Sequence, residues 1–468
     1  MAKKLNQFKR TKILATIGPA TNSREAIQEL VDSGANGFRL NFSHGSDQER
    51  RQQIAWVRSV AKAKKLPIAI LQDLQGPKIR LGDLPQPQHV HDGDTLNLVH
   101  NGDVSKGEIP VQYDLTTKVK KGERLYIFDG KIRTEITKVS DDQVTVEVKH
   151  GGLLMSRKGI NLPDTNLAGD IITDKDKEDI RFGADADIDY VALSFVQSAD
   201  DIEQLRKRLN KLGSTARVIA KIETGLAVEN IEEIIKVSDG VMVARGDLAI
   251  ETEPESVPVV QRQIIGLAQK YSKLCIVATQ MLASMVEMPE PTRAEVSDVA
   301  TAVILGTDCV MLSDETANGE FPAETVKFME KIVLYTQENS PVAPLFFHEE
   351  DHSVSSAVSS AVMTLAHQVE AKAIVAETAS GQTARSLAAH RPAMPIIMIT
   401  DNQRVANQLS LIYGGKSYVR PRSRSAAEKM TEWLHAHKIL KKDDLVVITQ
   451  GKYPGEIGGT DTIRVRKV

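Results

Sequence analysis

Short hydrophobic runs recur along the chain, and polar residues stand at the C-terminal end of each run. Such near-continuous apolar runs are typical of strands in a parallel sheet that is covered on both faces. Amphipathic helical patterns lie between most of them, one opened by Ser198 with Asp201 three residues later. The alternation predicts an α/β fold, a (β/α)8 TIM barrel with its active site at the C-terminal strand ends. The eight predicted strands span residues 12–18, 37–43, 68–73, 190–195, 218–223, 241–247, 274–279 and 309–315.

The pattern changes after Asp73, where about ninety residues precede the next barrel helix, a gap too long for one crossover. Within this gap apolar and polar positions alternate in short runs, and Asp-Gly and Asn-Gly dipeptides mark turns. We expect a small inserted β-barrel domain at 75–160, between barrel segments at 1–74 and 161–340. Because the insertion follows a strand end, it lies on the active-site side and suits a lid that excludes water.

A third domain follows a proline-containing interruption near residue 341. Apolar runs at 373–376, 395–399 and 445–448 are spaced by helical segments, which predicts an open α/β domain over residues 345–468. The turn after the first run can hold phosphate at a helix N-terminus, although many turns of this composition bind nothing. This candidate phosphate site consists of Ser380, Gly381, Gln382 and Thr383.

Charged residues gather at two neighbouring predicted strand ends. Lys221 and Glu223 are two residues apart and therefore share a strand face, and Asp247 closes the next run. Two carboxylates at neighbouring strand ends can hold a magnesium ion together, leaving places for substrate oxygens. The alternative interpretation is a buried ion pair between Lys221 and Glu223 that only fills the barrel.

Composition narrows the possible partners and location. The 468 residues contain 59 Lys and Arg against 62 Asp and Glu, so the net charge of −3 disfavours a nucleic-acid or membrane partner. The two cysteines, Cys275 and Cys309, lie in predicted strands, which excludes a disulfide framework and fits a reducing, cytoplasmic setting. We expect no signal peptide and no membrane span. The zinc-protease-like letters from His348 to His352 are interpreted as a chance match in an acidic linker.

Short motifs along the chain stand in the order found in one known family. Together they resemble the pyruvate kinase family over essentially the whole length, and the set is far more specific than any single member. The motifs are residues 16–19, 39–45, 76–80, 158–163, 221–223, 244–248, 278–282, 291–295 and 312–317.

The resemblance implies the last step of glycolysis, in which phosphoenolpyruvate and ADP become pyruvate and ATP. It implies that Glu223 and Asp247 hold magnesium or manganese, while Lys221 and Arg39 hold the phosphoryl group. The amides of Gly246 and Asp247 would anchor the substrate carboxylate. Residues with implied roles in protonating the enolate are Thr279, Ser313 and Glu315.

Four further residues match positions that meet the nucleotide in this family: Asn41, His44, Arg80 and Lys175. Each implied role has a plainer alternative. Arg80 and Asp73 could form hinge salt bridges, and Ser313 and Glu315 could cap the following helix.

The main departures from the family pattern lie among the residues that bind potassium in potassium-dependent members. The monovalent-cation region matches Asn41, Ser43 and Asp73, but Leu74 replaces a threonine and Lys78 replaces a glutamate of potassium-dependent members. A tethered ammonium at Lys78 can substitute for the cation, so potassium is expected not to be required. Leu226 and Asn318 also depart from the usual residues.

The resemblance implies a homotetramer with a phosphorylated allosteric effector, whose identity the sequence leaves open. The chain is expected to lack the additional C-terminal phosphotransfer-like module of some bacterial relatives. Two other function classes are weighed: a metal-dependent pyruvate aldolase or phosphoenolpyruvate-handling lyase, and a non-catalytic effector sensor. The lyase has no use for a nucleotide-covering insertion, and Lys221, Glu223, Asp247 and Thr279 argue against the sensor.

Overall fold

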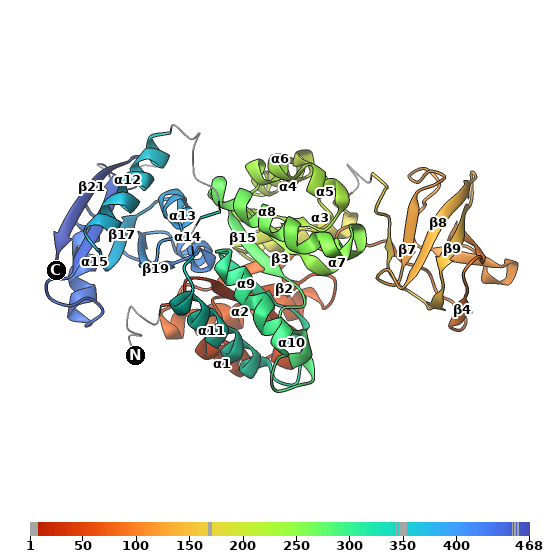
Figure 1. The fold of residues 1–468 in the computed structure, drawn as a ribbon, viewed down its shortest axis with the longest axis horizontal. Helices are drawn as coiled ribbons and strands as arrows, with labels where there is room; N and C mark the ends of the chain where they lie inside the picture. The colour runs from red at the N-terminus through yellow and green to blue at the C-terminus, as the bar shows by residue number, and fades with distance from the viewer. Residues whose placement is uncertain are drawn as a thin grey trace.

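The computed structural model describes residues 8–166, 171–342, 344–345, 353–451, 453, 455 and 458–468. The chain forms a central barrel with one further domain at each end (Figure 1). The segment from His348 to His352 lies outside the described residues. Within the described ranges, no helix is both long and apolar enough to cross a bilayer.

All eight predicted barrel strands form, and they close into one parallel barrel in the order β1-β16-β15-β14-β13-β12-β3-β2. Every residue of β1 is buried, as expected for a strand that is covered on both faces. The strands are β1 (Lys12–Ile17), β2 (Gly37–Asn41), β3 (Ala69–Asp73), β12 (Tyr190–Leu193), β13 (Arg217–Ile222), β14 (Gly240–Ala244), β15 (Leu274–Ala278) and β16 (Cys309–Leu312).

Helices surround the barrel, and several begin at the caps that the sequence predicts. Ser198 and Asp201 form the expected capping box at the start of α4. The helices are α1 (Arg24–Ser33), α2 (Asp47–Lys64), α3 (Asp174–Asp185), α4 (Ala199–Lys211), α5 (Gly225–Glu229), α6 (Ile231–Val237), α7 (Arg245–Glu251), α8 (Val257–Lys270), α9 (Arg293–Ile304), α10 (Asp314–Ala317) and α11 (Pro322–Asn339).

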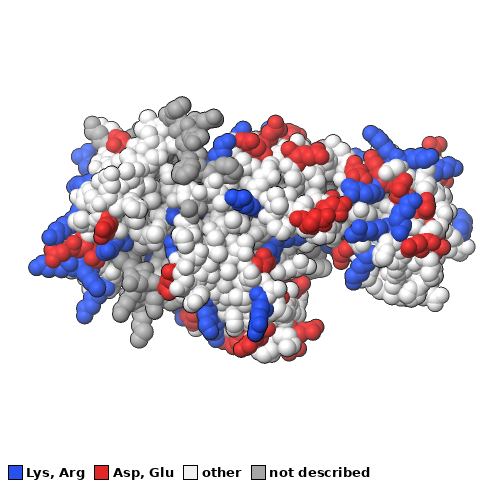
Figure 2. Space-filling model, viewed as in Figure 1, with Lys and Arg blue, Asp and Glu red and all other residues white. Residues whose placement is uncertain are grey.

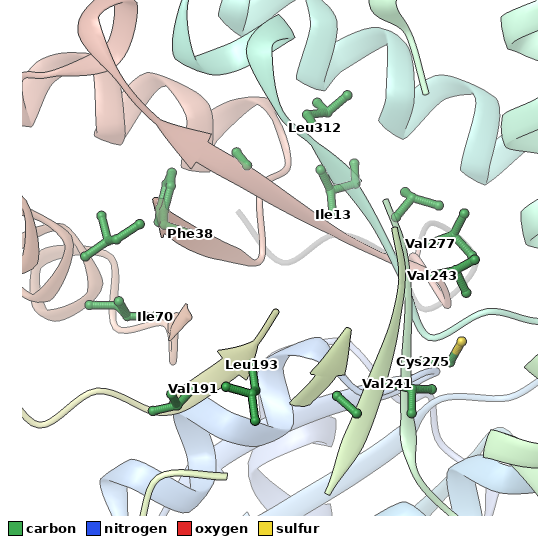
Figure 3. Close-up of a cluster of buried hydrophobic side chains, with 14 of the residues drawn as sticks. Ile13, Phe38, Ile70, Val191, Leu193, Val241, Val243, Cys275, Val277 and Leu312 are labelled. Atoms are coloured by element: carbon green, nitrogen blue, oxygen red, sulfur yellow. The ribbon is translucent and has the colours of Figure 1, made fainter. Parts of the chain in front are cut away.

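Side chains on the barrel strands alternate between two hydrophobic cores. One set points outward and packs against the helices, including Ile13, Phe38 and Val243 (Figure 3). The other set, with Leu14 and Met242, fills the barrel and is continuous with the core of the C-terminal domain. Polar residues of this second set at the strand ends therefore face into the mouth of the barrel.

The inserted domain is a curled six-stranded sheet in the order β11-β7-β8-β9-β5-β6, with a two-stranded ribbon of β10 and β4. The segment that leads into this domain, residues 79–82, hydrogen-bonds to both edge strands of the sheet. The amide of Ile160 in β11 donates to the Ile79 carbonyl, and the amide of Gly82 donates to the Pro110 carbonyl in β6. Basic and acidic side chains are intermingled on its visible surface (Figure 2). Its strands are β4 (Gln88–Val90), β5 (Thr95–His100), β6 (Glu108–Val111), β7 (Arg124–Ile127), β8 (Ile132–Val139), β9 (Val144–His150), β10 (Gly152–Leu154) and β11 (Ile160–Asn161).

The C-terminal domain is a mixed α/β domain with the strand order β19-β18-β17-β20-β21. The three predicted strands form, but sequence reasoning missed β19 and the antiparallel edge strand β21, whose exposed positions include several charged residues. The strands are β17 (Ala373–Glu377), β18 (Ile396–Thr400), β19 (Gly415–Val419), β20 (Leu445–Gly451) and β21 (Thr460–Lys467). The helices are α12 (Val354–Gln368), α13 (Gln382–Ala389), α14 (Gln403–Gln408) and α15 (Ala426–Ala436).

Candidate active site

Lys221 lies at the centre of the barrel mouth. Its ammonium donates to Ser194 Oγ at 2.7 Å, and it lies 2.8 Å from Glu223 Oε1 and 3.2 Å from Asp73 Oδ1. Burial opposes the charge of Lys221, but the two carboxylates outweigh burial and raise its pKa. Lys221 is therefore a fixed cation at neutral pH.

Asp73 holds a second cation beside Lys221. Arg39 Nε donates to Asp73 Oδ2 at 2.7 Å, and one terminal nitrogen of Arg39 also contacts Thr16 Oγ1 at 3.3 Å. Burial alone would raise the pKa of Asp73, but Lys221 and Arg39 keep that pKa below its usual value. Asp73 thus fixes both cations toward the same side of the barrel mouth.

Glu223 directly follows β13, which pairs with β14. The strand predicted over residues 241–247 ends at Ala244, and Asp247 lies instead in the first turn of α7, which follows β14. Glu223 is buried, and its Oε2 accepts a hydrogen bond from the amide of Phe195 at 2.7 Å. Burial raises the pKa of Glu223, Lys221 lowers it, and the nearby charge of Asp247 raises it again. A divalent cation between the two carboxylates would relieve this repulsion, so the donor set fits magnesium.

The protein supplies few ligands to such an ion. Among the described residues, no group of three or more His, Cys, Asp and Glu side chains is arranged to hold a metal. Two carboxylates suit magnesium, which takes its remaining ligands from substrate oxygens and water.

Thr279 is held in a strained backbone conformation. Its φ is 67°, an outlier for a β-branched residue. Its hydroxyl donates to the Ala278 carbonyl and accepts from the amide of Gly246 at 2.9 Å. The guanidinium of Arg245 donates to the Thr279 carbonyl at 2.6 Å and pairs with Asp298. This network fixes the Thr279 hydroxyl beside the start of α7, where Asp247 lies.

The carboxylate of Glu315 joins the end of β16 to the loop after Thr279. It accepts from the amides of Ser313 at 2.7 Å and Leu282 at 3.1 Å. Ser313 precedes α10, but its side chain makes no capping hydrogen bond there.

The four residues assigned to the nucleotide do not lie in one place. Asn41 and His44 line a cavity of about 470 Å³ that also reaches Arg39. The Lys175 ammonium donates to the Phe42 carbonyl at 2.6 Å and to Asp179 at 2.5 Å, so it is largely satisfied by the protein. Arg80 donates to the Arg157 carbonyl at the base of the lid.

The residues of the monovalent-cation region take distinct positions. Asn41 Oδ1 accepts from the Ser43 amide at 3.1 Å, and Asn41 and Asp73 are partners in the β2–β3 register. Leu74 is buried and offers no side-chain oxygen. Lys78 is exposed in the segment that joins β3 to the lid, which we call the lid hinge (residues 74–80). It lines a cavity that Asp247 also lines.

Sequence reasoning missed a further acidic residue beside Glu223 and Asp247, the predicted metal ligands. Glu251 lies one helical turn after Asp247 in α7, a spacing that could have revealed it. Burial raises its pKa to about 7, although a hydrogen bond from Asn161 Nδ2 lowers it and Asp247 raises it further. Asn161 is the last residue of β11, so this contact links the lid to the barrel. Ser194, which contacts Lys221, was also missed.

The C-terminal turn combines a left-handed glycine with the start of α13. Gly381 has a φ of 83°, and its amide donates to Thr378 Oγ1 at 2.9 Å. The hydroxyls of Thr383 and Thr460 lie 2.8 Å apart. The Ser380 carbonyl accepts from Arg217, the first residue of β13, at 2.7 Å.

Two adjacent carboxylates, a fixed lysine and arginine, and a cavity of about 470 Å³ that reaches Arg39 fit a phosphoryl-transfer enzyme of the TIM-barrel class. Family models agree: residues 8–326 match the pyruvate kinase barrel domain and residues 356–466 match the pyruvate kinase alpha/beta domain. The chain belongs to the pyruvate kinase family, and it is an enzyme with that activity.

Individual relatives match over nearly the whole chain. A pyruvate kinase of Thermotoga maritima is 40% identical over 98% of this chain and 99% of its own length. Pyruvate kinase 2 of Synechocystis is also 40% identical, over 98% of this chain and 79% of its own. The crystal structure of a pyruvate kinase from Cryptosporidium parvum aligns with a TM-score of 0.91 at 32% identity, over 99% of this chain and 97% of that one.

Proposed function

We propose that the side chains at the barrel mouth transfer the phosphoryl group of phosphoenolpyruvate to ADP, giving pyruvate and ATP. The observation that carries this proposal is the position of Lys221, which lies between Asp73 and Glu223 beside Arg39. Lys221 and Arg39 hold the phosphoryl oxygens, and their charges count for more once the lid excludes water.

Glu223 and Asp247 would hold magnesium, or manganese, at this site. When bound, the ion offsets the anionic charge of substrate and nucleotide, which otherwise repel each other. The amides at the start of α7 anchor the substrate carboxylate, since helix N-termini favour anions. For this role the Gly246 amide must exchange its hydrogen bond to Thr279 for one to the substrate.

Thr279 positions the proton that reaches the methylene carbon of the enolate. Its hydroxyl is fixed beside the carboxylate anchor, and its strained backbone is held by Arg245. Glu315 acts on this network by holding the loop after Thr279, and Ser313 supplies a hydroxyl near it.

The nucleotide phosphates approach from the side of Asn41 and His44, which share a cavity with Arg39. Arg80 and Lys175 reach them when the lid closes and their present contacts to carbonyl oxygens are exchanged.

Potassium is not required in this proposal. Leu74 provides no side-chain oxygen ligand, and Lys78 supplies positive charge in the cavity that Asp247 also lines.

A phosphorylated effector binds at Ser380, Gly381, Gln382 and Thr383, since Gly381 caps the N-terminus of α13 and helix N-termini favour anions.

We also propose a homotetramer in the cytoplasm. The thiols of Cys275 and Cys309 are free and buried, which suits a reducing compartment. Light scattering after gel filtration should give four times the chain mass of 51.3 kDa, and a monomer mass would contradict the assembly.

A lactate dehydrogenase-coupled assay tests the reaction. We expect pyruvate to form only when phosphoenolpyruvate, ADP and magnesium are all present, and to stop when the metal is chelated. Pyruvate formation without a nucleotide would favour lyase chemistry instead.

A further inference from the structure

A cavity of about 470 Å³ opens from the phosphoryl-transfer site toward α2. Its size lies within the usual range for a pocket that buries a small organic ligand. It is bounded by the ends of β1 and β2, the first turns of α2, and α10. The proposed nucleotide residues Asn41 and His44 both line it, so the inference below rests on the proposed function.

The two ends of this cavity differ. Arg39 and Asn41 lie at the inner end, because β2 carries them into the barrel mouth beside Asp73. Glu49 and Gln53 line the outer end, since they belong to α2 on the outside of the barrel. A nucleotide with its phosphates at Arg39 therefore extends its base toward Glu49.

Glu49 is held in place by neighbouring amides. Its Oε1 accepts from Asn22 Nδ2 at 2.9 Å, and Asn22 Oδ1 accepts from Gln53 Nε2 at 2.9 Å. Its other oxygen lies over the backbone of Gly45, where an added Cβ would be 3.1 Å away. Glu49 lines the cavity, and among the described residues the hydrogen bond that its carboxylate accepts goes to Oε1, so Oε2 keeps its capacity to accept from a ligand.

The charge of Glu49 is not shared with the adjacent arginine. Arg50 pairs instead with Asp47 and Asp179, and it also donates to the carbonyls of Phe42 and His44. Asp314 lines the same cavity. The outer end thus presents carboxylate oxygens, which only accept hydrogen bonds when ionised.

We propose that Glu49 selects the base of the acceptor nucleotide and favours guanine over adenine. Guanine presents two adjacent donors, N1–H and the 2-amino group. One can be accepted by Glu49 Oε2 and the other by the remaining lone pair of Oε1, whose first lone pair accepts from Asn22 Nδ2. Adenine presents its 6-amino group next to the N1 lone pair, which a carboxylate repels. A well-formed bidentate contact of this kind discriminates between bases by roughly 1–3 kcal/mol, or about fivefold to 150-fold.

The test compares kcat/KM for ADP, GDP and inosine diphosphate in the full-length enzyme. We expect GDP to exceed ADP by about fivefold or more, with inosine diphosphate between them because it keeps N1–H but lacks the amino group. Glu49→Gln should lower the GDP to ADP ratio by roughly tenfold. Glu29→Gln makes the same chemical change at an exposed position of α1 that does not line the cavity, and it should leave the ratio unchanged.

The outcomes separate this inference from the proposed reaction. Equal use of ADP and GDP, or a ratio that Glu49→Gln leaves unchanged, overturns the role of Glu49 while turnover itself supports phosphoryl transfer. Turnover of Glu49→Gln with ADP shows that the variant is folded. Absence of turnover with every nucleoside diphosphate would overturn both.

Discussion

Lys221 keeps its charge although its side chain is only 12% exposed, because Asp73 and Glu223 lie within ion-pair distance. A lysine buried without such partners tends to lose its proton. The strand ends thus create a cation that is fixed in position and needs little reorganisation when the phosphoryl group arrives.

Replacement of this cation should affect catalysis far more than folding. We expect Lys221→Met to lower kcat by about two to three orders of magnitude, the scale for losing one preorganised charged donor. Steady-state assays and circular dichroism measure the two effects. Lys207→Met, at an exposed position of α4, serves as the control. Turnover within a few-fold of the unmodified enzyme would refute the role of Lys221.

Glu251 makes folding stability depend on pH. Its folded pKa of about 7 lies above the ordinary value of 4.5, so the folded state binds the proton more tightly than the unfolded state. The stabilising effect of the protonated form is complete below about pH 4.5 and is lost as pH rises through 7.

Glu251→Gln removes this cost of ionisation. Without metal, the variant should gain on the order of 2 kcal/mol relative to the unmodified protein between pH 5 and pH 8. Thermal melts in chelator at both pH values should show a larger increase in Tm at pH 8. An equal increase at both values would mean that Glu251 ionises normally.

At the scale of elements, the lid hinge (residues 74–80, between β3 and the lid) places a positive charge near Asp247. Lys78 lines cavities on both sides of this hinge, and one of them also contains Asp247. Leu74, at the start of the hinge, is buried in the core between the barrel strands and the surrounding helices. In the proposed function, Lys78 therefore supplies a cation at this hinge, where Leu74 offers no side-chain oxygen ligand.

From these hinge residues we expect turnover that does not depend on potassium. In sodium-free and potassium-free buffer with tetramethylammonium, potassium chloride at matched ionic strength should not activate the enzyme. Lys78→Glu should lower activity in that buffer, because it replaces a cation with an anion near the anionic substrates. Lys120→Glu, on the exposed lid surface, is the control. Strong activation of the unmodified enzyme by potassium would disprove this role of Lys78.

A second element, the turn before α13, is joined to the active-site strands. Arg217 bonds the Ser380 carbonyl and also pairs with Asp239, the residue before β14. Through Arg217, β13 thus contacts this turn at its start and leads to Glu223 at its other end. The ion pair with Asp239 also joins Arg217 to the start of β14, which leads to Asp247.

We expect Thr383→Glu to abolish activation by phosphorylated effectors while leaving the unactivated turnover largely intact, because a carboxylate at the turn repels phosphate. A panel of AMP, a sugar monophosphate and a sugar bisphosphate measures this. Thr383→Ser keeps the hydroxyl and should still be activated. An unchanged activation constant in Thr383→Glu would place the effector elsewhere.

Across the whole molecule, the three domains do not have three independent cores. The interior of the barrel is continuous with the C-terminal domain through Leu411 and Tyr413, whereas the lid has a core of its own. The barrel and the C-terminal domain should therefore lose structure together, and the lid separately.

Two cavity-forming substitutions test this division. Leu411→Ala and Ile136→Ala each remove a fully buried side chain and should cost about 2–5 kcal/mol. Hydrogen exchange should show lower protection in both barrel and C-terminal domain for Leu411→Ala, but only in the lid for Ile136→Ala. Exchange confined to the C-terminal domain in Leu411→Ala would contradict a shared core.

The sequence by itself determined the barrel strands, because near-continuous apolar runs are typical of parallel strands buried on both faces, and eight strand–helix units are the number that closes a barrel. The two-residue spacing also placed Lys221 beside Glu223, since strand periodicity is local. Local patterns gave only a weak signal for β21, because most of its positions are exposed and its apolar residues are Ile463 and Val465 alone. The strand also needs β20 to pair with it.

Tertiary structure alone decided which distant residues meet. Asp73 joins Arg39 to Lys221 only because β3 lies between β2 and β12 in the closed barrel. The contact of Asn161 with Glu251 likewise depends on where the lid returns to the barrel. Such contacts join residues far apart in the chain, so the pKa values and the shape of the nucleotide cavity follow from the packing of elements and not from any local pattern.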